Sequence, residues 1–167
     1  MTKVDQTTRR TLSEIGSTCQ KAARGAGCIW GLAEESGNAA RVLEGVGLPG
    51  SECVAAILSC TRICHCTGAD TGPSCGIAAS AMLSDRVSDI PTDGKMEIGE
   101  VIGATLLAAP LIQAARRSGL SYMLSKDGNE LLIGSDGVEG EFSQFNPRDT
   151  AISVYVAQSK PPKQPSP

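Results

Sequence analysis

Residues 119–142 read GLSYMLSKDGNELLIGSDGVEGEF, and in this stretch the spacing of apolar residues becomes that of β-strands. Tyr122 and Leu124 alternate with polar neighbours, the pattern of a strand with one buried face. The dipeptides at 127–128 and 136–137 are both Asp-Gly, which is a hairpin turn signal. A third turn signal at Asn146–Pro147 precedes an alternating run at 152–156. We therefore predict four short antiparallel strands, with one face packed on helices and the other exposed to water.

Upstream of this stretch the apolar residues recur at helical spacing. We expect a first helix that a Thr11–Glu14 capping box starts and that residues 25–27 end, a second over 31–45, and a third capped by Ser51. A short apolar run at 77–83 predicts a fourth helix. Residues 84–95 read as a polar connection. The pattern over 98–117 predicts a fifth helix, which Pro110 should kink or restart.

These elements define the predicted architecture. The fold class is α+β, with an N-terminal helical layer packed on a small antiparallel C-terminal β-meander. We expect a disordered leader over 1–10, a single domain over 11–158, and a Pro-rich disordered tail over 159–167. Within the domain, residues 11–118 should be mainly helical and 119–158 mainly strand. Frequent Ala and Gly should let the helices approach closely.

Composition excludes several classes of function. Only 3% of the 167 residues are aromatic, which argues against stacking of single-stranded nucleic acid. A net charge of −3 argues against binding to a phosphate backbone, and a single His excludes multi-histidine sites. The longest apolar stretch is too short to span a membrane, and the polar N-terminus lacks a secretory pattern. We expect a cytoplasmic protein with no nucleic-acid or membrane partner, whose cysteines are thiols or ligands rather than disulfides.

Residues 60–76 read CTRICHCTGADTGPSCG, and this segment concentrates four of the seven Cys with the only His. One hypothesis is a zinc or iron–sulfur site, because both groups take thiolate ligands. The spacing departs from the paired C-x₂₋₄-C arms of structural zinc sites. The ligands of this hypothetical metal site would be Cys60, Cys64, Cys66 and Cys75.

A second hypothesis for the same segment is nucleophilic catalysis. Cys75 precedes a predicted helix, whose N-terminal N–H groups would favour the thiolate. His65 would be the base and Asp70 would orient it. A third hypothesis is an anion site, in which Gly72 and Gly76 let backbone N–H groups face the ligand. Alternatively, the cysteines are small core residues and the segment has no chemical role.

Charged residues surround the only Trp. Trp30 should pack beneath a helix–helix corner, or else line a ligand pocket. Glu34 and Glu35 fall in the first turn of the second helix, where the helix dipole favours acids. Arg24 and Arg41 could pair with them, and an acid/base dyad of the two Glu residues is a further alternative.

Several motifs resemble those of one bacterial family. They are KAARGAG at 21–27, WGLAEE at 30–35, AAR at 39–41 and GLPG at 47–50. With the region at 104–117, they resemble domain-of-unknown-function family 3726 over residues 11–135. The resemblance implies a bacterial cytosolic protein and carries no activity, cofactor or catalytic residue with it. The Cys-rich segment is not part of the family pattern, so the resemblance favours a site built from Arg24, Trp30, Glu34, Glu35 and Arg41.

Together these observations favour a small-molecule-binding protein, or an accessory protein of a metabolic enzyme, that acts through the Trp30 corner. Its partner would be a small molecule or a protein, and no cofactor is assigned. The first alternative is a small thiol-dependent enzyme with Cys75 as nucleophile and His65 as base. The second is a zinc or iron–sulfur module built on the Cys cluster.

Overall fold

The three N-terminal helices lie close to the ranges that local sequence signals predict. The computed structural model describes residues 10–60, 74–126, 128–145 and 152–159, and for most of 152–159 it describes the backbone alone. Within it, α1 spans Leu12–Gly25, α2 spans Trp30–Glu44 and α3 spans Gly50–Leu58. The expected leader, the Asn146–Pro147 turn and most of the expected tail lie outside the described residues. The three predicted helices are confirmed.

The backbone N–H groups at the starts of α1 and α3 find their hydrogen-bond partners in two different ways. At α1 the predicted capping box is present, because the Thr11 backbone N–H donates to the Glu14 carboxylate at 2.8 Å and the Thr11 hydroxyl accepts from the Glu14 N–H. At α3 the prediction that Ser51 is the N-cap is wrong. Ser51 lies inside the helix, where its N–H and hydroxyl donate to the Glu44 carboxylate at 3.0 and 2.7 Å. A side chain from α2 therefore satisfies an N–H group that local capping leaves free.

Glycine contacts confirm the predicted close approach of the helices. A Cβ atom added at Gly37 of α2 would lie 2.5 Å from the carbonyl oxygen of Gly16 in α1. A Cβ at Gly50 of α3 would collide with the carbonyl oxygen of Ala40 in α2. No real Cβ fits at such separations, so small residues determine the spacing of these three helices.

The sheet is larger than the sequence pattern predicts. Its strands are β1 (Ser74–Cys75), β2 (Lys95–Ile102), β3 (Ser121–Lys126), β4 (Asn129–Ile133), β5 (Val138–Glu139) and β6 (Ile152–Ser159). Their spatial order is β1-β2-β6-β3-β4-β5, and every neighbouring pair is antiparallel except β1 and β2. The predicted small antiparallel C-terminal sheet is confirmed. However, β6 returns beside β3 instead of continuing the β3-β4-β5 meander.

The predicted helix over 98–117 is wrong in its first part, which belongs to β2. The register of β2 against β6 shifts between Glu97 and Gly99, and Gly99 has a φ of +91°. This irregularity breaks the alternation of apolar and polar residues, so the strand has no clear period of two. The chain then forms a 3-10 turn at Ala104–Leu107, named η2, and the helix α5 at Ala108–Ser118. Pro110 lies in the first turn of α5, where its missing N–H costs nothing.

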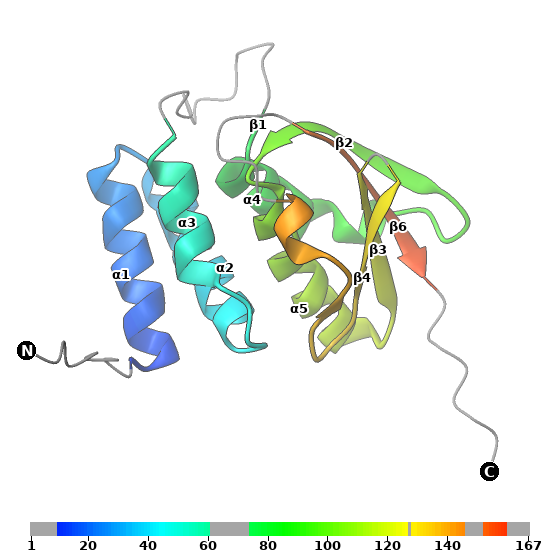
Figure 1. Cartoon of the computed structure of the whole chain (residues 1–167), viewed down its shortest axis with the longest axis horizontal. Helices are drawn as coiled ribbons and strands as arrows, with labels where there is room; N and C mark the ends of the chain where they lie inside the picture. Colours follow the sequence, from blue (N-terminus) through cyan, green and yellow to red (C-terminus); the bar gives the residue numbers. More distant parts are fainter. Residues whose placement is uncertain (1–9, 61–73, 127, 146–151, 160–167) are drawn as a thin grey trace, which may run out of the picture.

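Figure 1 shows how these elements are layered. Helices α5 and α4 (Gly76–Arg86) lie between the sheet and the three N-terminal helices, and the α+β class is confirmed. Alternation in the strands orients Tyr122, Leu124, Leu131 and Ile133 into the core, whereas Met123 and Leu132 face away from it. None of the helices in the described ranges has the length and apolar character needed to cross a membrane.

Candidate functional site

A groove runs between α1 and α2, with a volume of about 310 Å³. We name it the α1–α2 groove. Its lining is polar apart from two glycines, and consists of Ser13, Gly16, Ser17 and Gln20 from α1, with Glu34, Gly37, Asn38 and Arg41 from α2.

Helical spacing and small residues together form this groove. Ser13, Ser17 and Gln20 are four and three residues apart, and so share one face of α1. Glu34, Asn38 and Arg41 have the same spacing on α2. Because Gly16 and Gly37 contribute no side chains where the helices touch, their backbones form the floor of the groove and the polar side chains form its walls.

The two charged groups of the groove are separated along α2. Arg41 Nη2 donates to Asn38 Oδ1 at 2.9 Å, which holds the guanidinium beside the groove. Glu34 has no hydrogen bond or ion pair with the part of the chain that the structure describes. Arg41 follows Glu34 by seven positions, which corresponds to about 10 Å of helix. The groove therefore presents an anionic group near one end and a cationic group near the other.

Trp30 lies one helical turn before Glu34, beyond the end of the groove. Its side chain is 61% exposed, so the prediction that it packs beneath the corner is wrong. The guanidinium carbon of Arg24 is 5.7 Å from the centroid of the indole ring, a cation–π distance, and Arg24 Nη1 also donates to the Cys28 carbonyl oxygen at 2.6 Å. Arg24 therefore fixes the chain that turns from α1 into α2 and covers one face of the indole.

Glu34 and Glu35 do not form the acid/base dyad that the sequence analysis gave as an alternative. Adjacent residues on a helix point about 100° apart. Glu34 lines the α1–α2 groove, whereas Glu35 lines a separate small crevice with Ser80 of α4 and Gln113 of α5. Neither forms an ion pair with Arg24 or Arg41 in the described structure, so the predicted pairings are not present. Of the five residues that the sequence proposed here, only Glu34 and Arg41 line the groove.

Most of the Cys-rich segment cannot be compared with the structure. Cys64, His65, Cys66, Asp70 and Gly72 lie outside the described residues. In the described parts, no group of three or more His, Cys, Asp or Glu is placed to hold a metal ion. For Cys64 and Cys66 the metal hypothesis therefore remains a prediction.

The two cysteines at the ends of this segment are described. Cys60 is buried directly after α3, and Cys75 is the N-cap of α4. Cys75 is disulfide-bonded, so the prediction that the cysteines are thiols or ligands is wrong for this residue. A disulfide sulfur is no thiolate, and the nucleophile hypothesis therefore applies only to a form of the protein with this bond reduced.

Gly76 has a packing role at the start of α4. A Cβ atom at this position would collide with the carbonyl oxygen of Gly103, at the end of β2. This contact explains the glycine without an anion, so the anion-site hypothesis gains nothing from it.

The sequence analysis missed the two glycines of the groove, Gly16 and Gly37, and also its polar residues Ser13, Ser17, Gln20 and Asn38. The four polar residues show why. Their spacing of three and four residues is visible in the sequence, but such a polar stripe is also typical of a solvent-exposed helix face. Only the contact between α1 and α2 shows that the two stripes face one groove.

The chain is thus an α+β protein with a polar groove between its first two helices. Residues 10–67 match the model of a family described as "Protein of unknown function (DUF3726)". This match confirms the resemblance to that family over residues 10–67, and not over the whole expected range of 11–135. It contains α1, α2, α3 and every residue of the groove. It also contains Cys60, Cys64, His65 and Cys66, so the expectation that the Cys-rich segment lies outside the family pattern is wrong for its first part. No curated protein and no solved structure matches the chain.

Proposed function

We propose that the chain binds a small zwitterionic molecule in the α1–α2 groove. The observation that carries this proposal is the pair Glu34 and Arg41, which line one groove about two helical turns apart. An ammonium group would bind to Glu34, whose carboxylate has no partner among the described residues, and a carboxylate or phosphate would bind to Arg41. The volume of about 310 Å³ suits a metabolite-sized ligand.

Calorimetric titration with a series of ω-amino acids tests the proposal. The probes are 4-aminobutyrate, 6-aminohexanoate and 8-aminooctanoate, which present the same two charges at increasing separation. We expect saturable binding that depends on chain length, because the groove holds its charged groups at one separation. Trp30 is the only Trp of the chain and lies one turn from Glu34, so its fluorescence should respond to the same probes.

Variants locate the binding in the groove. Glu34→Gln and Arg41→Gln should each weaken binding about tenfold, because each removes one charged contact. Glu35→Gln is the matched control, since it removes the same charge from the adjacent residue, which lines a different crevice. Absence of saturable binding for all three probes, or an equal loss in the Glu35→Gln variant, would contradict the proposal.

An accessory role beside an enzyme is a second candidate, which a separate observation favours. Ile29 and Trp30 are adjacent and 55% and 61% exposed. Exposed apolar side chains of this size, and Trp above all, are typical of protein interfaces. A Trp30→Ala variant that keeps probe binding but loses co-purifying enzyme would support this role, whereas unchanged co-purification would contradict it.

A further inference from the structure

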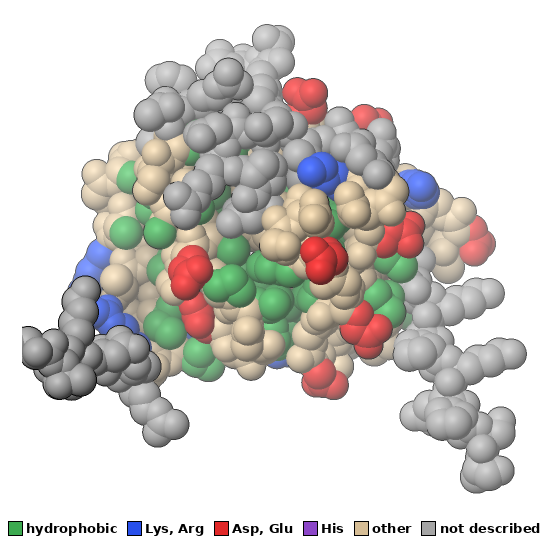
Figure 2. All heavy atoms as spheres, viewed as in Figure 1, with side chains coloured by type: hydrophobic (Ala, Val, Ile, Leu, Met, Phe, Trp, Pro, Cys, Tyr) green, Lys and Arg blue, Asp and Glu red, His purple; other side chains and the backbone are tan. Residues whose placement is uncertain are grey.

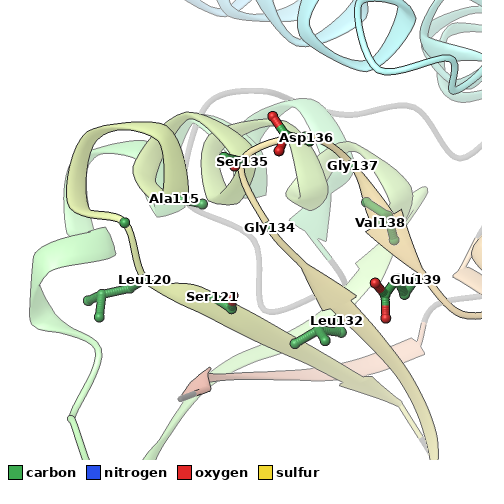
Figure 3. Close-up of a pocket in the computed structure, with 11 residues that line it drawn as sticks. Ala115, Leu120, Ser121, Leu132, Gly134, Ser135, Asp136, Gly137, Val138 and Glu139 are labelled. Atoms are coloured by element: carbon green, nitrogen blue, oxygen red, sulfur yellow. The ribbon is translucent and has the colours of Figure 1, made fainter. Parts of the chain in front are cut away.

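A second cavity, with a volume of about 480 Å³, lies at the end of the sheet and outside the family match. It is bounded by the end of α5, the start of β3 and the turn between β4 and β5 (Figure 3). Its lining residues other than glycine are Ala115, Leu120, Ser121, Leu132, Ser135, Asp136, Val138 and Glu139.

Missing side chains keep this cavity open. Gly119, Gly134 and Gly137 all line it, and a Cβ atom added at any of them would meet nothing within 4 Å. Gly119 has a φ of +71° and ends α5, which is a sufficient reason for glycine there. Gly134 has no such φ and no close neighbour, so neither backbone conformation nor packing requires a glycine at this position. The missing side chain of Gly134 leaves open space in the cavity.

The lining combines apolar surface with negative charge. Leu120, Leu132 and Val138 supply the apolar part. Asp136 in the β4–β5 turn and Glu139 in β5 supply two carboxylates (Figure 3). Neither carboxylate has a hydrogen bond or ion pair to another described residue. Among the lining residues that the structure describes there is no Lys or Arg.

A guanidinium group beside this turn is already engaged. Arg116 of α5 donates from Nε to the Ser135 carbonyl oxygen at 2.8 Å, which ties the β4–β5 turn to the helix. On the face drawn in Figure 2, acidic side chains are likewise more frequent than basic ones over the sheet end of the molecule. The cavity thus has the polarity of a site for cations.

We propose that this cavity binds an organic cation, namely a protonated amine on an aliphatic body. The aliphatic part would contact Leu120, Leu132 and Val138, and the ammonium group would be attracted by the negative charge that Asp136 and Glu139 give the cavity. A volume of about 480 Å³ accommodates such a ligand with room for water. This site is separate from the α1–α2 groove, and each can exist without the other.

Three probes of equal chain length test the charge selectivity. The full chain, labelled with ¹⁵N, is titrated at pH 7 with hexylamine, 1-hexanol and hexanoate while amide chemical shifts are recorded. Hexylamine carries a positive charge at this pH, and we expect it alone to cause saturable shifts, centred on residues 119–121 and 132–139. Equal shifts with hexanol, shifts spread over the whole surface, or no saturable shift with hexylamine would overturn the proposal.

Charge variants and a filling variant complete the test. Asp136→Asn and Glu139→Gln should each weaken hexylamine binding about fivefold to tenfold. Glu97→Gln in β2 is the control, because it changes the net charge equally and is separated from β4 by β6 and β3. Gly134→Val should abolish binding by filling the cavity, while its N–H can still donate to the Gly137 carbonyl oxygen. Wild-type affinity in both carboxylate variants would overturn the proposal whatever the Gly134→Val variant does.

Discussion

At the scale of single residues, Cys53 of α3 shows how the core treats a titratable group. Its side chain is 1% exposed, and this burial raises the pKa of the Cys53 thiol. The Thr105 hydroxyl, which has no nitrogen or oxygen partner among the described residues, interacts with this thiol and partly opposes the shift in its pKa. Burial raises the pKa of the Cys19 thiol in the same way. Both are core thiols that resist ionisation.

The stability of the protein should therefore fall at alkaline pH. At pH 7 both thiols are protonated in the folded and unfolded chains, so they contribute no pH dependence. Above about 8.5, the ordinary thiol pKa, the unfolded chain releases these protons while the folded chain retains them. The free energy of unfolding then decreases, by at most about 1.4 kcal/mol per pH unit for each thiol.

Urea unfolding at pH 7.0 and 9.5 measures this effect. A Cys19→Ala/Cys53→Ala double variant is the control, because it keeps every other group that titrates in this range. Its free energy of unfolding should change less between the two pH values than that of the wild type. An equal change in both proteins would show that the two thiols do not carry the effect.

At the scale of elements, the crossing of α1 and α2 depends on backbone contact between Gly16 and Gly37. Substituting Gly37→Ala places a Cβ 2.5 Å from the Gly16 carbonyl oxygen, so the helices must move apart. We expect a loss of about 1–3 kcal/mol in the free energy of unfolding, in spite of the higher helix propensity of Ala. The α1–α2 groove should widen at the same time, because Gly37 forms part of its floor.

Gly31→Ala is the matched control for this prediction. Gly31 lies in the same helix, has open space where its Cβ would be, and should gain up to about 1 kcal/mol from the same change. Denaturant unfolding of both variants gives the comparison. If Gly37→Ala were as stable as Gly31→Ala, the close crossing of the two helices would be excluded.

At the scale of the whole molecule, the helices and the sheet meet where Gly76, Gly103 and Ile57 are in contact. A Cβ at Gly76 of α4 would strike the Gly103 backbone, and a Cβ at Gly103 would strike the Ile57 side chain of α3. Gly103 also has a φ of +74°, which other residues adopt only with strain. This contact joins α3, α4 and the end of β2 within one continuous core.

Gly76→Ala should therefore destabilise the molecule as a whole. We expect its free energy of unfolding to fall by about 1–3 kcal/mol, in one cooperative transition, because the core connects both layers. Gly134→Ala should be nearly neutral, since its added Cβ meets open space. Guanidinium unfolding followed by far-UV circular dichroism distinguishes them, and equal midpoints for the two variants would contradict the prediction.

Local interactions explain which elements could be predicted. The Thr11–Glu14 capping box, the end of α5 at Gly119 and the turn between Lys126 and Asn129 each depend on residues within a few positions of one another. Their signals are therefore present in a short stretch of sequence. Strand β2 was missed because its irregular pairing with β6 hides the alternation, and that pairing is made with residues more than fifty positions away.

The candidate sites likewise combine features that local sequence determines with features that depend on contacts between distant residues. The sequence by itself determined the α+β class, the three N-terminal helices, the family resemblance and the presence of Glu34 and Arg41 on one face of α2. Only the tertiary structure decided that Trp30 is exposed, that Glu34 and Glu35 line different cavities, and that a second cavity lies at the end of the sheet. The physical reason is that exposure and hollow space depend on which elements meet, and the glycine contacts that bring these elements together join residues distant in the chain.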